Sequence, residues 1–303
     1  MVNVDLKKEL SCRVRILKHT IRGVLNLVCN EKIDKINCYF YLIECTDNCI
    51  REDDFLNYLR SQVIQYVLKE EELREMKDQD KIVNNVLKAI GKLVDREDNS
   101  ELGELTLFCL LESQLNAVQL LNKMSLKTNP NNYYNGLDAI HISNDGTNTT
   151  IHFGESKVKK KFNEALNDSV NQVGTFLEDR TRRDFEVELI KSHLDPKKFE
   201  GIMEEILKYL NPYEKHKRNL RESISIFIGY SWEDLKDIED KTDKQITEEI
   251  IKKYEGEIES NINRIVSQID NSNFKKYDFN IFILPFKDVD NLKKKFNILL
   301  NSR

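Results

Sequence analysis

Two short runs of alternating hydrophobic and polar residues flank a turn signal near the middle of the chain. Residues 136–157 read GLDAIHISNDGTNTTIHFGESK, and the turn signal is the Asn-Asp-Gly triplet at 144–146. Alternation with period two on both sides of such a turn is typical of an antiparallel hairpin. Pairing that is symmetric about the turn places Asp138 opposite or nearly opposite Glu155, with their Cβ atoms roughly 5 Å apart.

The alternation also predicts which side chains share a face of this hairpin. Side chains on a strand point alternately to the two faces, so Asp138 shares a face with Glu155 and Lys157. Because unpaired buried charge is strongly disfavoured, the two acids need compensation, either from a bound cation or from a salt bridge between Lys157 and Glu155. Between the charged residues this face carries hydrophobic side chains, namely Ile140, Ile142, Ile151 and Phe153.

A helical pattern lies upstream of the hairpin. Hydrophobic residues at helical spacing predict a helix over residues 100–124, with Ser100 as its N-cap and acids in its first turn. An acid on the buried face of a helix is unusual, and we expect Glu104 to supply a third carboxylate because its stripe is the most apolar. Glu101 and Glu112 are rival candidates. The stripe comprises Glu104, Phe108, Leu111, Leu115 and Val118.

The rest of the chain alternates between predicted helices and predicted strands. Periodicity indicates helices over residues 162–177, 195–210 and 246–269, strands over 223–230 and 279–286, and a short last helix. Strand, helix and strand at this spacing suggest a crossover connection and a mixed sheet. We therefore predict an α/β fold in which a mixed sheet is flanked by helices.

Residues 1–98 form a first organisational unit. A strand is predicted over residues 37–45 and is followed by two amphipathic helices, but no catalytic constellation occurs here. The polar residues 95–100 are typical of a connector and place a soft boundary near residue 98. We expect residues 1–98 to be an α+β accessory region that contacts a partner, and residues 99–303 to be the domain that carries the hairpin.

Length and composition limit the class of protein. The chain has 303 residues, of which 33% are charged and 40% are hydrophobic, so it suits one large domain or two small ones with long, charged, solvent-facing helices. The longest apolar runs, such as Leu107 to Leu111, are too short to span a membrane, and no apolar signal segment opens the chain. We expect a cytoplasmic protein.

The cysteines indicate neither a disulfide framework nor a zinc site. Six of them lie at positions 12, 29, 38, 45, 49 and 109, without a Cys-x-x-Cys pair or a histidine at zinc-ligand spacing. Buried reduced thiols are the simplest interpretation, although Cys38, Cys45 and Cys49 could in principle bind a metal.

The net charge of −5 argues against a protein that holds nucleic acid across its whole surface. Binding must then be local or be supplied by a partner. One basic cluster, Lys159, Lys160 and Lys161, directly follows the hairpin, and three arginines occur at positions 180, 182 and 183. Such runs are usually solvated faces, but a position beside the carboxylates favours contact with phosphate.

These residues resemble the site of a known class of enzymes. An acid on a helix, Asp138 on one strand, and Glu155 and Lys157 on the next strand resemble the Asp…Glu-x-Lys site of restriction-endonuclease-like nucleases. More narrowly, residues 136–141 (GLDAIH) followed by residues 154–157 (GESK) are similar to the HamA family, the nuclease subunits of the Hachiman antiphage defence system. The predicted closing strand and last helix add to this likeness.

The resemblance implies a metal-dependent nuclease that acts on DNA. Mg²⁺ or Mn²⁺ would be held by Asp138 and Glu155, with the carbonyl of Ser156 and the carboxylate of Glu104 as further ligands. Lys157 would orient or activate the attacking water and balance charge on the phosphate. The family also implies a partner helicase, HamB, that restrains the nuclease until it senses aberrant or phage DNA.

Two other functions stay open. The chain could be a non-catalytic interaction or scaffold subunit that keeps a nuclease-like fold, or it could be an RNA-directed phosphodiesterase. The complete set of Asp138, Glu155 and Lys157 argues against a scaffold. The sequence contains neither a Gly-x-x-x-x-Gly-Lys phosphate loop nor a Gly-x-Ser-x-Gly elbow, so we expect neither a nucleotide-driven motor nor acyl transfer.

Overall fold

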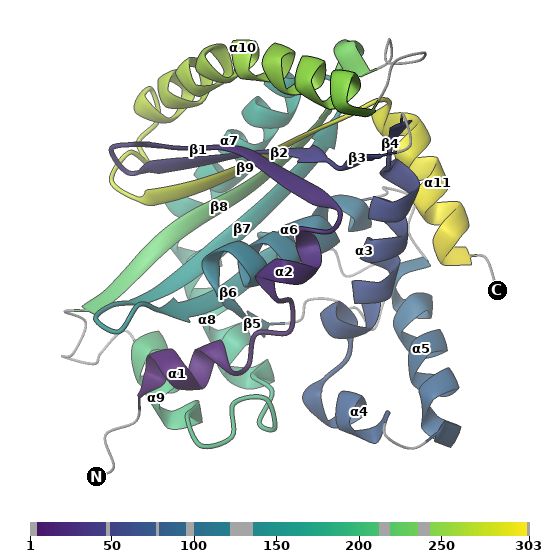
Figure 1. Ribbon diagram of the computed structural model, residues 1–303. Helices are drawn as coiled ribbons and strands as arrows, with labels where there is room; N and C mark the ends of the chain where they lie inside the picture. Colours follow the sequence, from purple (N-terminus) through teal and green to yellow (C-terminus); the bar gives the residue numbers. More distant parts are fainter. Residues whose placement is uncertain are drawn as a thin grey trace.

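A seven-stranded sheet runs through the centre of the molecule (Figure 1). The structure is a computed structural model that describes residues 5–46, 49–76, 79–94, 100–121, 136–211, 219–235 and 243–301. Within these residues the strand order is β1-β2-β9-β8-β7-β6-β5. In that order the strands are Leu25–Ile33, Ile36–Ile43, Asp278–Phe286, Leu220–Ser231, Thr149–Lys159, Ala139–Asn144 and Val118–Leu121.

The sheet is mixed, as predicted. The four central strands β2, β9, β8 and β7 run parallel to one another. The strands outside them pair antiparallel, β1 with β2 at one edge, and β7 with β6 and β6 with β5 at the other. Parallel neighbours need crossover connections, and the helix between β8 and β9 is the long one predicted over residues 246–269.

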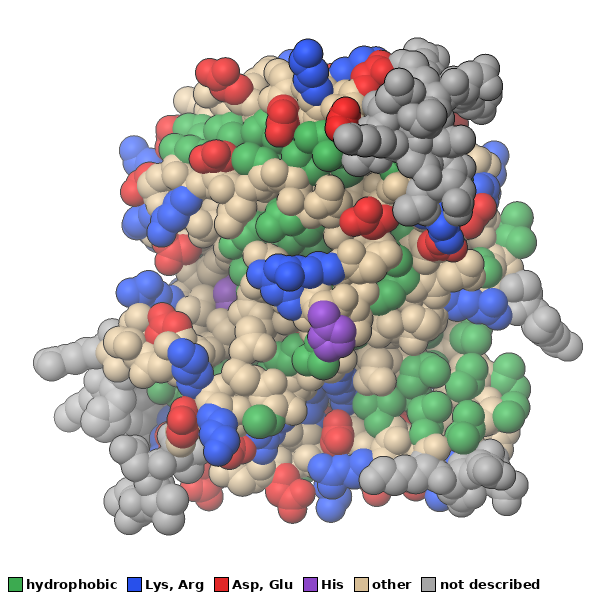
Figure 2. Space-filling view, viewed as in Figure 1, with side chains coloured by type: hydrophobic (Ala, Val, Ile, Leu, Met, Phe, Trp, Pro, Cys, Tyr) green, Lys and Arg blue, Asp and Glu red, His purple; other side chains and the backbone are tan. Residues whose placement is uncertain are grey.

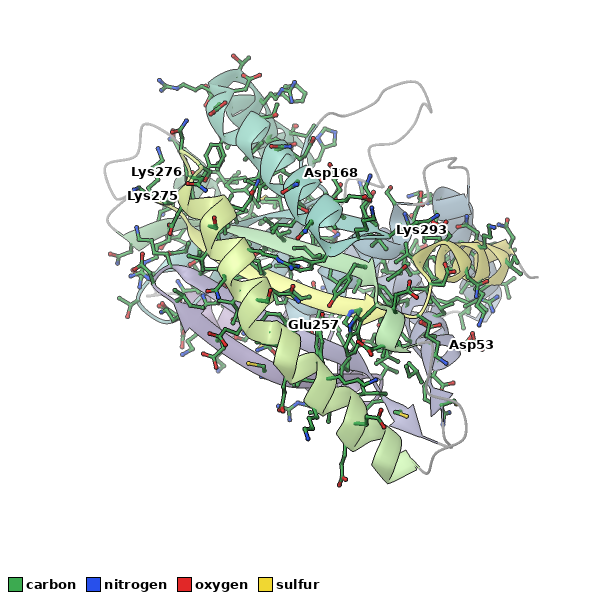
Figure 3. The ribbon with its side chains drawn as sticks, turned by 90° about the horizontal axis from the view of Figure 1, so that it is seen from above. Asp53, Asp168, Glu257, Lys275, Lys276 and Lys293 are labelled. Carbon is green, nitrogen blue, oxygen red and sulfur yellow. The ribbon has the colours of Figure 1, made fainter. Side chains whose placement is uncertain are left out.

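Helices cover both faces of this sheet, which confirms the predicted α/β class. α6 (Glu101–Leu115) lies on one face against β6, β7 and β8, whereas α7 (Phe162–Glu178) and α10 (Asp243–Asp270) lie on the other face (Figure 1, Figure 3). α11 (Val289–Asn301) packs against α3 (Glu52–Val67) and α5 (Gln79–Val94). The remaining elements are α1 (Leu6–Ser11), α2 (Lys18–Ile21), α4 (Glu70–Glu75), α8 (Arg180–His193), α9 (Met203–Leu210), the 3-10 helix η3 (Glu233–Leu235) and the short strands β3 (Cys45–Thr46) and β4 (Cys49–Ile50).

The central strands are hydrophobic on both of their faces because helices cover the sheet from both sides. In β8 the alternating Ile224, Ile226 and Ile228 are buried, as the sequence predicts, and Phe227 on the opposite face is buried as well. The buried core therefore extends through the sheet into both helical layers.

The helix predicted over residues 100–124 is too long. α6 ends at Leu115, and Asn116 follows it in the left-handed conformation with φ of 52°. Asparagine tolerates this conformation better than most residues and commonly ends a helix. Val118 then begins β5, which pairs with β6 at the edge of the sheet, so placing Val118 on the helical stripe was wrong. Residues 122–124 lie outside the described part of the chain.

Three further elements differ from the sequence-based expectation. β1 and α8 were not predicted, although both are well formed. The helix expected to open at Asp195 begins only at Met203, after a series of turns in which Gly201 has φ of 83°. Such a conformation suits glycine and interrupts a helix, so the apolar spacing before residue 203 belongs to turns.

Residues 1–98 are joined to the rest of the fold through the sheet. β2 pairs in parallel with β9, from Ile36 beside Phe279 to Phe40 beside Ile283. α3 packs against α6 and α11. The sheet is therefore continuous across the boundary predicted near residue 98.

The surface of α5 is unusually apolar. Hydrophobic side chains gather on the lower right of the face shown in Figure 2, over the position of α5 in Figure 1. Val83 and Leu87, one helical turn apart on α5, are 62% and 59% exposed. Among the described residues, every helix is too short or too polar to span a membrane.

Candidate active site

The hairpin predicted around residue 146 is present with the expected register. Ala139 pairs with Gly154 and Ile142 pairs with Ile151, so Asp138 lies directly before the first pair and beside Glu155. The turn closes with a hydrogen bond from the Asp145 N–H to the Asn148 carbonyl of 3.1 Å. Alternation and turn residues thus place the two acids at the same end of the hairpin.

The carboxylate of Asp138 bonds to the next strand. Its Oδ2 accepts hydrogen bonds from the backbone N–H and the hydroxyl of Ser156, each at 2.8 Å. Burial raises the pKa of Asp138, and the negative charge of Glu104 raises it further, whereas the charge of Lys157 and the bonds from Ser156 oppose this rise. The acid Glu104 and the base Lys157 therefore shift the pKa of Asp138 in opposite directions.

Glu155 and Lys157 form a salt bridge on the face of β7 that α7 covers. The Glu155 side chain is only 2% exposed, while that of Lys157 is 26% exposed. Burial alone would lower the pKa of Lys157, but the charges of Glu155 and Asp138 outweigh it and raise that pKa. The salt bridge that the sequence offered as the alternative to a bound cation is present, and its lysine also interacts electrostatically with Asp138.

Glu104 is the acid of α6 that lies near the hairpin. Its Oε2 accepts a hydrogen bond of 3.1 Å from the Tyr66 hydroxyl, and its Oε1 accepts one of 2.8 Å from the Ser100 hydroxyl. The Ser100 hydroxyl thus bonds to the side chain of Glu104 and makes no capping hydrogen bond to the backbone of α6. The contact with Tyr66 is not evident from sequence spacing, because Tyr66 lies 38 positions away from Glu104.

The rival acids have other surroundings. Glu112 accepts hydrogen bonds from the backbone N–H groups of Arg15 and Ile16, at 2.6 and 2.9 Å, so it holds the N-terminal segment. Glu101 is buried in the first turn of α6. Of the three candidates, Glu104 is the one whose charge raises the pKa of Asp138.

Two glycines allow α6 to approach the hairpin closely. A Cβ atom on Gly103 would lie 3.0 Å from the Ser156 hydroxyl, and one on Gly154 would lie 3.0 Å from a methyl group of Leu107. Side chains at these positions would push the helix away from β7. The close packing brings Glu104 of α6 toward Asp138.

The basic residues after the hairpin are exposed and paired. Lys159 contacts Asp168 of α7 at 3.0 Å and Lys160 contacts Asp290 of α11 at 2.7 Å, while Lys161 contacts Glu164 of α7 at 3.5 Å. A fourth lysine that sequence reasoning missed also reaches this strand. Lys293 of α11, labelled in Figure 3, donates a hydrogen bond of 3.0 Å to the Val158 carbonyl.

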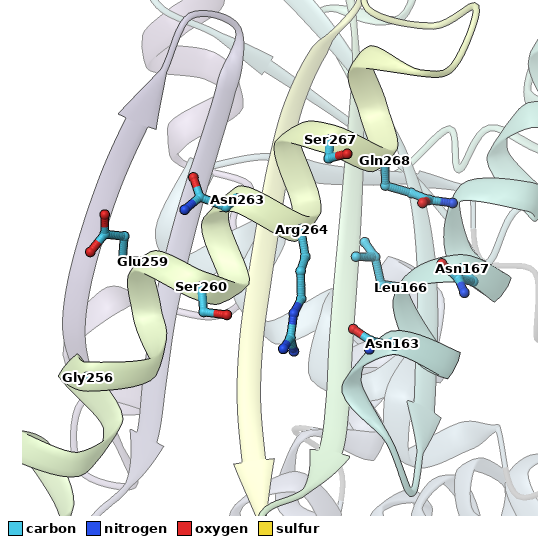
Figure 4. Close-up of a pocket in the computed structure, with 10 residues that line it drawn as sticks. All are labelled: Asn163, Leu166, Asn167, Gly256, Glu259, Ser260, Asn263, Arg264, Ser267 and Gln268. Atoms are coloured by element: carbon cyan, nitrogen blue, oxygen red, sulfur yellow. The ribbon is translucent and has the colours of Figure 1, made fainter.

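Two hollows of the surface lie away from the hairpin acids. A groove of about 720 Å³ separates α7 from α10 and is lined mainly by polar side chains such as Asn163, Asn263 and Arg264 (Figure 4). A second hollow of about 790 Å³ lies between the N-terminal segment and α3, with Arg15 and Lys198 in its wall. The acidic centre, by which we mean Asp138, Glu155 and Glu104, lines neither of them.

Among the described residues, no group of three or more histidine, cysteine, aspartate or glutamate side chains is arranged to hold an ion. All six cysteines are free thiols, but only Cys38 and Cys109 are buried, so the expectation of buried thiols is wrong for the other four.

A mixed sheet flanked by helices, with Asp138, Glu155 and Lys157 at the end of a hairpin and Glu104 on the helix α6, is consistent with a restriction-endonuclease-like α/β fold. A family model for HamA matches residues 19–298, and the chain belongs to the HamA family. The resemblance found in the sequence is thereby confirmed. No curated protein matches the chain.

Proposed function

We propose that this chain is a metal-dependent nuclease that hydrolyses phosphodiester bonds in DNA, as the effector of a Hachiman antiphage defence complex. The observation that carries the proposal is the position of Lys157. Its amine pairs with Glu155, interacts with the charge of Asp138 and keeps about a quarter of its side chain exposed. An accessible cation beside two acids is what hydrolysis of a phosphodiester requires.

The donor set fits a hard divalent cation. Mg²⁺ prefers oxygen ligands, keeps several waters and needs only one or two carboxylates, so Asp138 and Glu155 suffice, with Glu104 beside them. When bound, Mg²⁺ or Mn²⁺ would polarise the phosphate and lower the pKa of a bound water. A cation would also relieve the repulsion between Glu104 and Asp138 that raises the pKa of Asp138.

The backbone of Ser156 supports its expected role as a ligand. β6 ends its pairing at Ala139 and Gly154, so none of the described residues forms a strand beside β7 on that side beyond Gly154. The Ser156 N–H points toward Asp138, and in a strand the N–H and C=O of one residue point to the same side. The Ser156 carbonyl is therefore directed to the side on which the Asp138 carboxylate lies.

The electrostatics of Lys157 favour an orienting role over proton abstraction. A raised pKa keeps the amine protonated at neutral pH, so it donates hydrogen bonds and contributes positive charge. We infer that Lys157 orients the attacking water and stabilises negative charge that develops on the phosphate. Glu155 holds the lysine in place through their salt bridge.

The basic residues outside the centre suit a local contact with the nucleic-acid backbone. Lys159, Lys160 and Lys161 are exposed, and a phosphate can replace the surface carboxylates that they contact. With a net charge of −5, the chain cannot attract DNA over its whole surface. We infer that a partner helicase, HamB, supplies much of the affinity for DNA.

The apolar surface of α5 supports a partner contact through residues 1–98. Val83 and Leu87 expose hydrophobic side chains side by side on one helical face, and exposed apolar patches commonly mark protein interfaces. We propose that the accessory region contributes α5 to this contact.

Cleavage of plasmid DNA by the purified chain with Mg²⁺, Mn²⁺ or EDTA tests the function. Glu155→Ala and Lys157→Ala should each lower the rate at least about 100-fold. Lys157→Ala removes the salt bridge of a buried carboxylate, so Lys157→Arg is added to keep a positive charge there. The matched control is Lys191→Ala, which removes an exposed ion pair with Glu188 on α8 and should cleave like the wild type.

Each outcome has a defined meaning. Loss of cleavage in the Lys157 variants with unchanged melting temperature supports the catalytic role, whereas equal cleavage by Lys157→Ala and Lys191→Ala contradicts it. If the wild type cleaves nothing, the assay is repeated with the helicase partner and ATP. Absence of cleavage in that assay as well would favour a scaffold subunit. Cleavage of RNA alone would favour a phosphodiesterase of RNA.

A further inference from the structure

The carboxylate of Glu104 is held at both of its oxygens by different parts of the chain. Ser100, one turn earlier, donates to Oε1 at 2.8 Å, and Tyr66 of α3 donates to Oε2 at 3.1 Å. A glutamate side chain has three rotatable bonds and would otherwise sample several positions. Two donors on opposite oxygens define the plane of the carboxylate.

The hydroxyl of Tyr66 is not needed to fill space. Its ring packs against Phe108 with 5.2 Å between ring centroids, and the residue is only 3% exposed. A phenylalanine would occupy nearly the same volume and make the same ring contact. A buried tyrosine hydroxyl normally has a polar partner, and here that partner is Glu104. Its neighbour Gly103 packs against the Ser156 hydroxyl that donates to Asp138.

The end of α3 that carries Tyr66 is itself anchored. The guanidinium of Arg15 donates hydrogen bonds to the carbonyls of Gln65 and Leu68, at 2.7 and 2.9 Å. These carbonyls flank Tyr66 in the last turn of α3, and a cation at a helix C-terminus is favourable. The accessory region therefore reaches the acidic centre through one rigid helix end.

We infer that Tyr66 is a positioning residue that holds the Glu104 carboxylate in place for the cation shared with Asp138. The inference rests on the proposed nuclease function and adds to it a residue from outside the predicted catalytic domain. Partners that orient metal ligands commonly change metal affinity 10- to 100-fold when they are removed. Loss of the hydroxyl should therefore weaken metal binding, and the defect in cleavage should disappear at saturating metal.

The test compares wild type, Tyr66→Phe, Glu104→Gln and the double variant. Two quantities are measured, the affinity for Mn²⁺ by isothermal titration calorimetry and the Mn²⁺ concentration that gives half-maximal cleavage of plasmid DNA. Tyr254→Phe is the matched control, because it removes another fully buried tyrosine hydroxyl, on α10. Melting temperatures of the two tyrosine variants show whether packing is affected equally.

Tyr66→Phe should raise the Mn²⁺ concentration for half-maximal cleavage about 10-fold, and Tyr254→Phe should leave it unchanged. Added to Glu104→Gln, the tyrosine substitution should have no further effect, because its target is gone. A midpoint within twofold of wild type, or an equal increase in the Glu104→Gln background, would overturn the inference alone. A wild type that binds no Mn²⁺ and cleaves nothing, even with the helicase, would overturn the proposed function and this inference together.

Discussion

The two ends of α6 each bury a glutamate, and the two are surrounded differently. Glu112, near the C-terminal end, accepts hydrogen bonds from three backbone N–H groups and lies 3.9 Å from the amine of the buried Lys198. Glu104, in the first turn, accepts hydrogen bonds from two hydroxyl groups and has a second acid, Asp138, as its electrostatic neighbour. One helix therefore carries a carboxylate beside a buried lysine at one end and a carboxylate beside a second acid at the other.

We propose that this difference separates a structural acid from a functional one. At Glu112 the charge of Lys198 opposes the rise in pKa that burial causes, and the N-terminal segment, α6 and Lys198 are tied together. At Glu104 the fold places two acids together, although their repulsion costs stability. Proteins retain such destabilising arrangements where activity needs them, which is why the first turn of α6 is the end that we assign to catalysis.

The largest expected effect concerns Glu112, near the C-terminal end of α6. Glu112→Ala removes the carboxylate beside the buried Lys198 and the acceptor of three backbone N–H groups, so the free energy of unfolding should fall by about 3–5 kcal/mol. Glu104→Gln keeps the shape of the side chain and should cost less than about 1 kcal/mol. Urea denaturation measures both, and similar losses in the two variants would remove the distinction between the ends of α6.

An intermediate effect tests how closely α6 approaches the sheet. In Gly154→Ala the new Cβ would lie 2.9 Å from the Cβ of Ala139 and 3.0 Å from Leu107, so we expect a loss of about 1–3 kcal/mol and weaker metal binding as Glu104 moves away. The control is Gly256→Ala on α10, where a Cβ meets nothing within 4 Å. That change should stabilise the helix by up to about 1 kcal/mol, and equal behaviour of the two variants in urea would contradict close packing at Gly154.

The smallest expected effect concerns the repulsion between Asp138 and Glu104, and it is measured as a pH dependence of the free energy of unfolding. Burial and the charge of Glu104 raise the pKa of Asp138 above its ordinary 3.8, so the folded state binds this proton more tightly than the unfolded state. The cost to stability is therefore present at neutral pH and is relieved as the pH falls through the raised pKa toward 3.8. Asp138→Asn should be more stable than wild type by about 1 kcal/mol at pH 7.5.

That gain should shrink as the pH falls, because the raised pKa makes wild-type Asp138 take up its proton at a higher pH than an ordinary aspartate does. Urea denaturation of both proteins, without divalent metal, at pH 7.5 and pH 4 gives the comparison. A wild type that is the more stable of the two at pH 7.5 would show that Ser156 and Lys157 already compensate Asp138 fully. The acidic centre would then be as structural as the surroundings of Glu112.

Local pattern accounts for much of the fold. The hairpin, α7, α10, β8 and β9 lie where period-two or helical spacing predicts them, because each element was long and bounded by clear turn or polar residues. Elements with weak local signals were missed. β1 ends in three consecutive exposed positions within Leu25–Ile33 and so lacks clean alternation, and the apolar run of α6 continues past Asn116 into β5 without a break in composition.

The candidate site divides in the same way. Asp138, Glu155 and Lys157 could be placed together from the sequence, because hairpin register depends on residues only a few positions apart. The sequence favoured Glu104 over Glu101 and Glu112 because its stripe is the most apolar, and the structure added their surroundings: Glu112 bonds to the N-terminal segment, whereas Glu104 lies near Asp138. The catalytic and metal-binding roles of these residues stay predictions.

By itself the sequence determined the hairpin and its charged end, the mixed α/β architecture and the likeness to HamA. Only the tertiary structure decided that Tyr66 of the accessory region bonds to Glu104, that Arg15 anchors α3, and that the first two strands complete the sheet. The reason is physical. Spacing along a chain encodes contacts within one strand or helix turn, whereas contacts between distant segments depend on how whole elements pack, which no short pattern specifies.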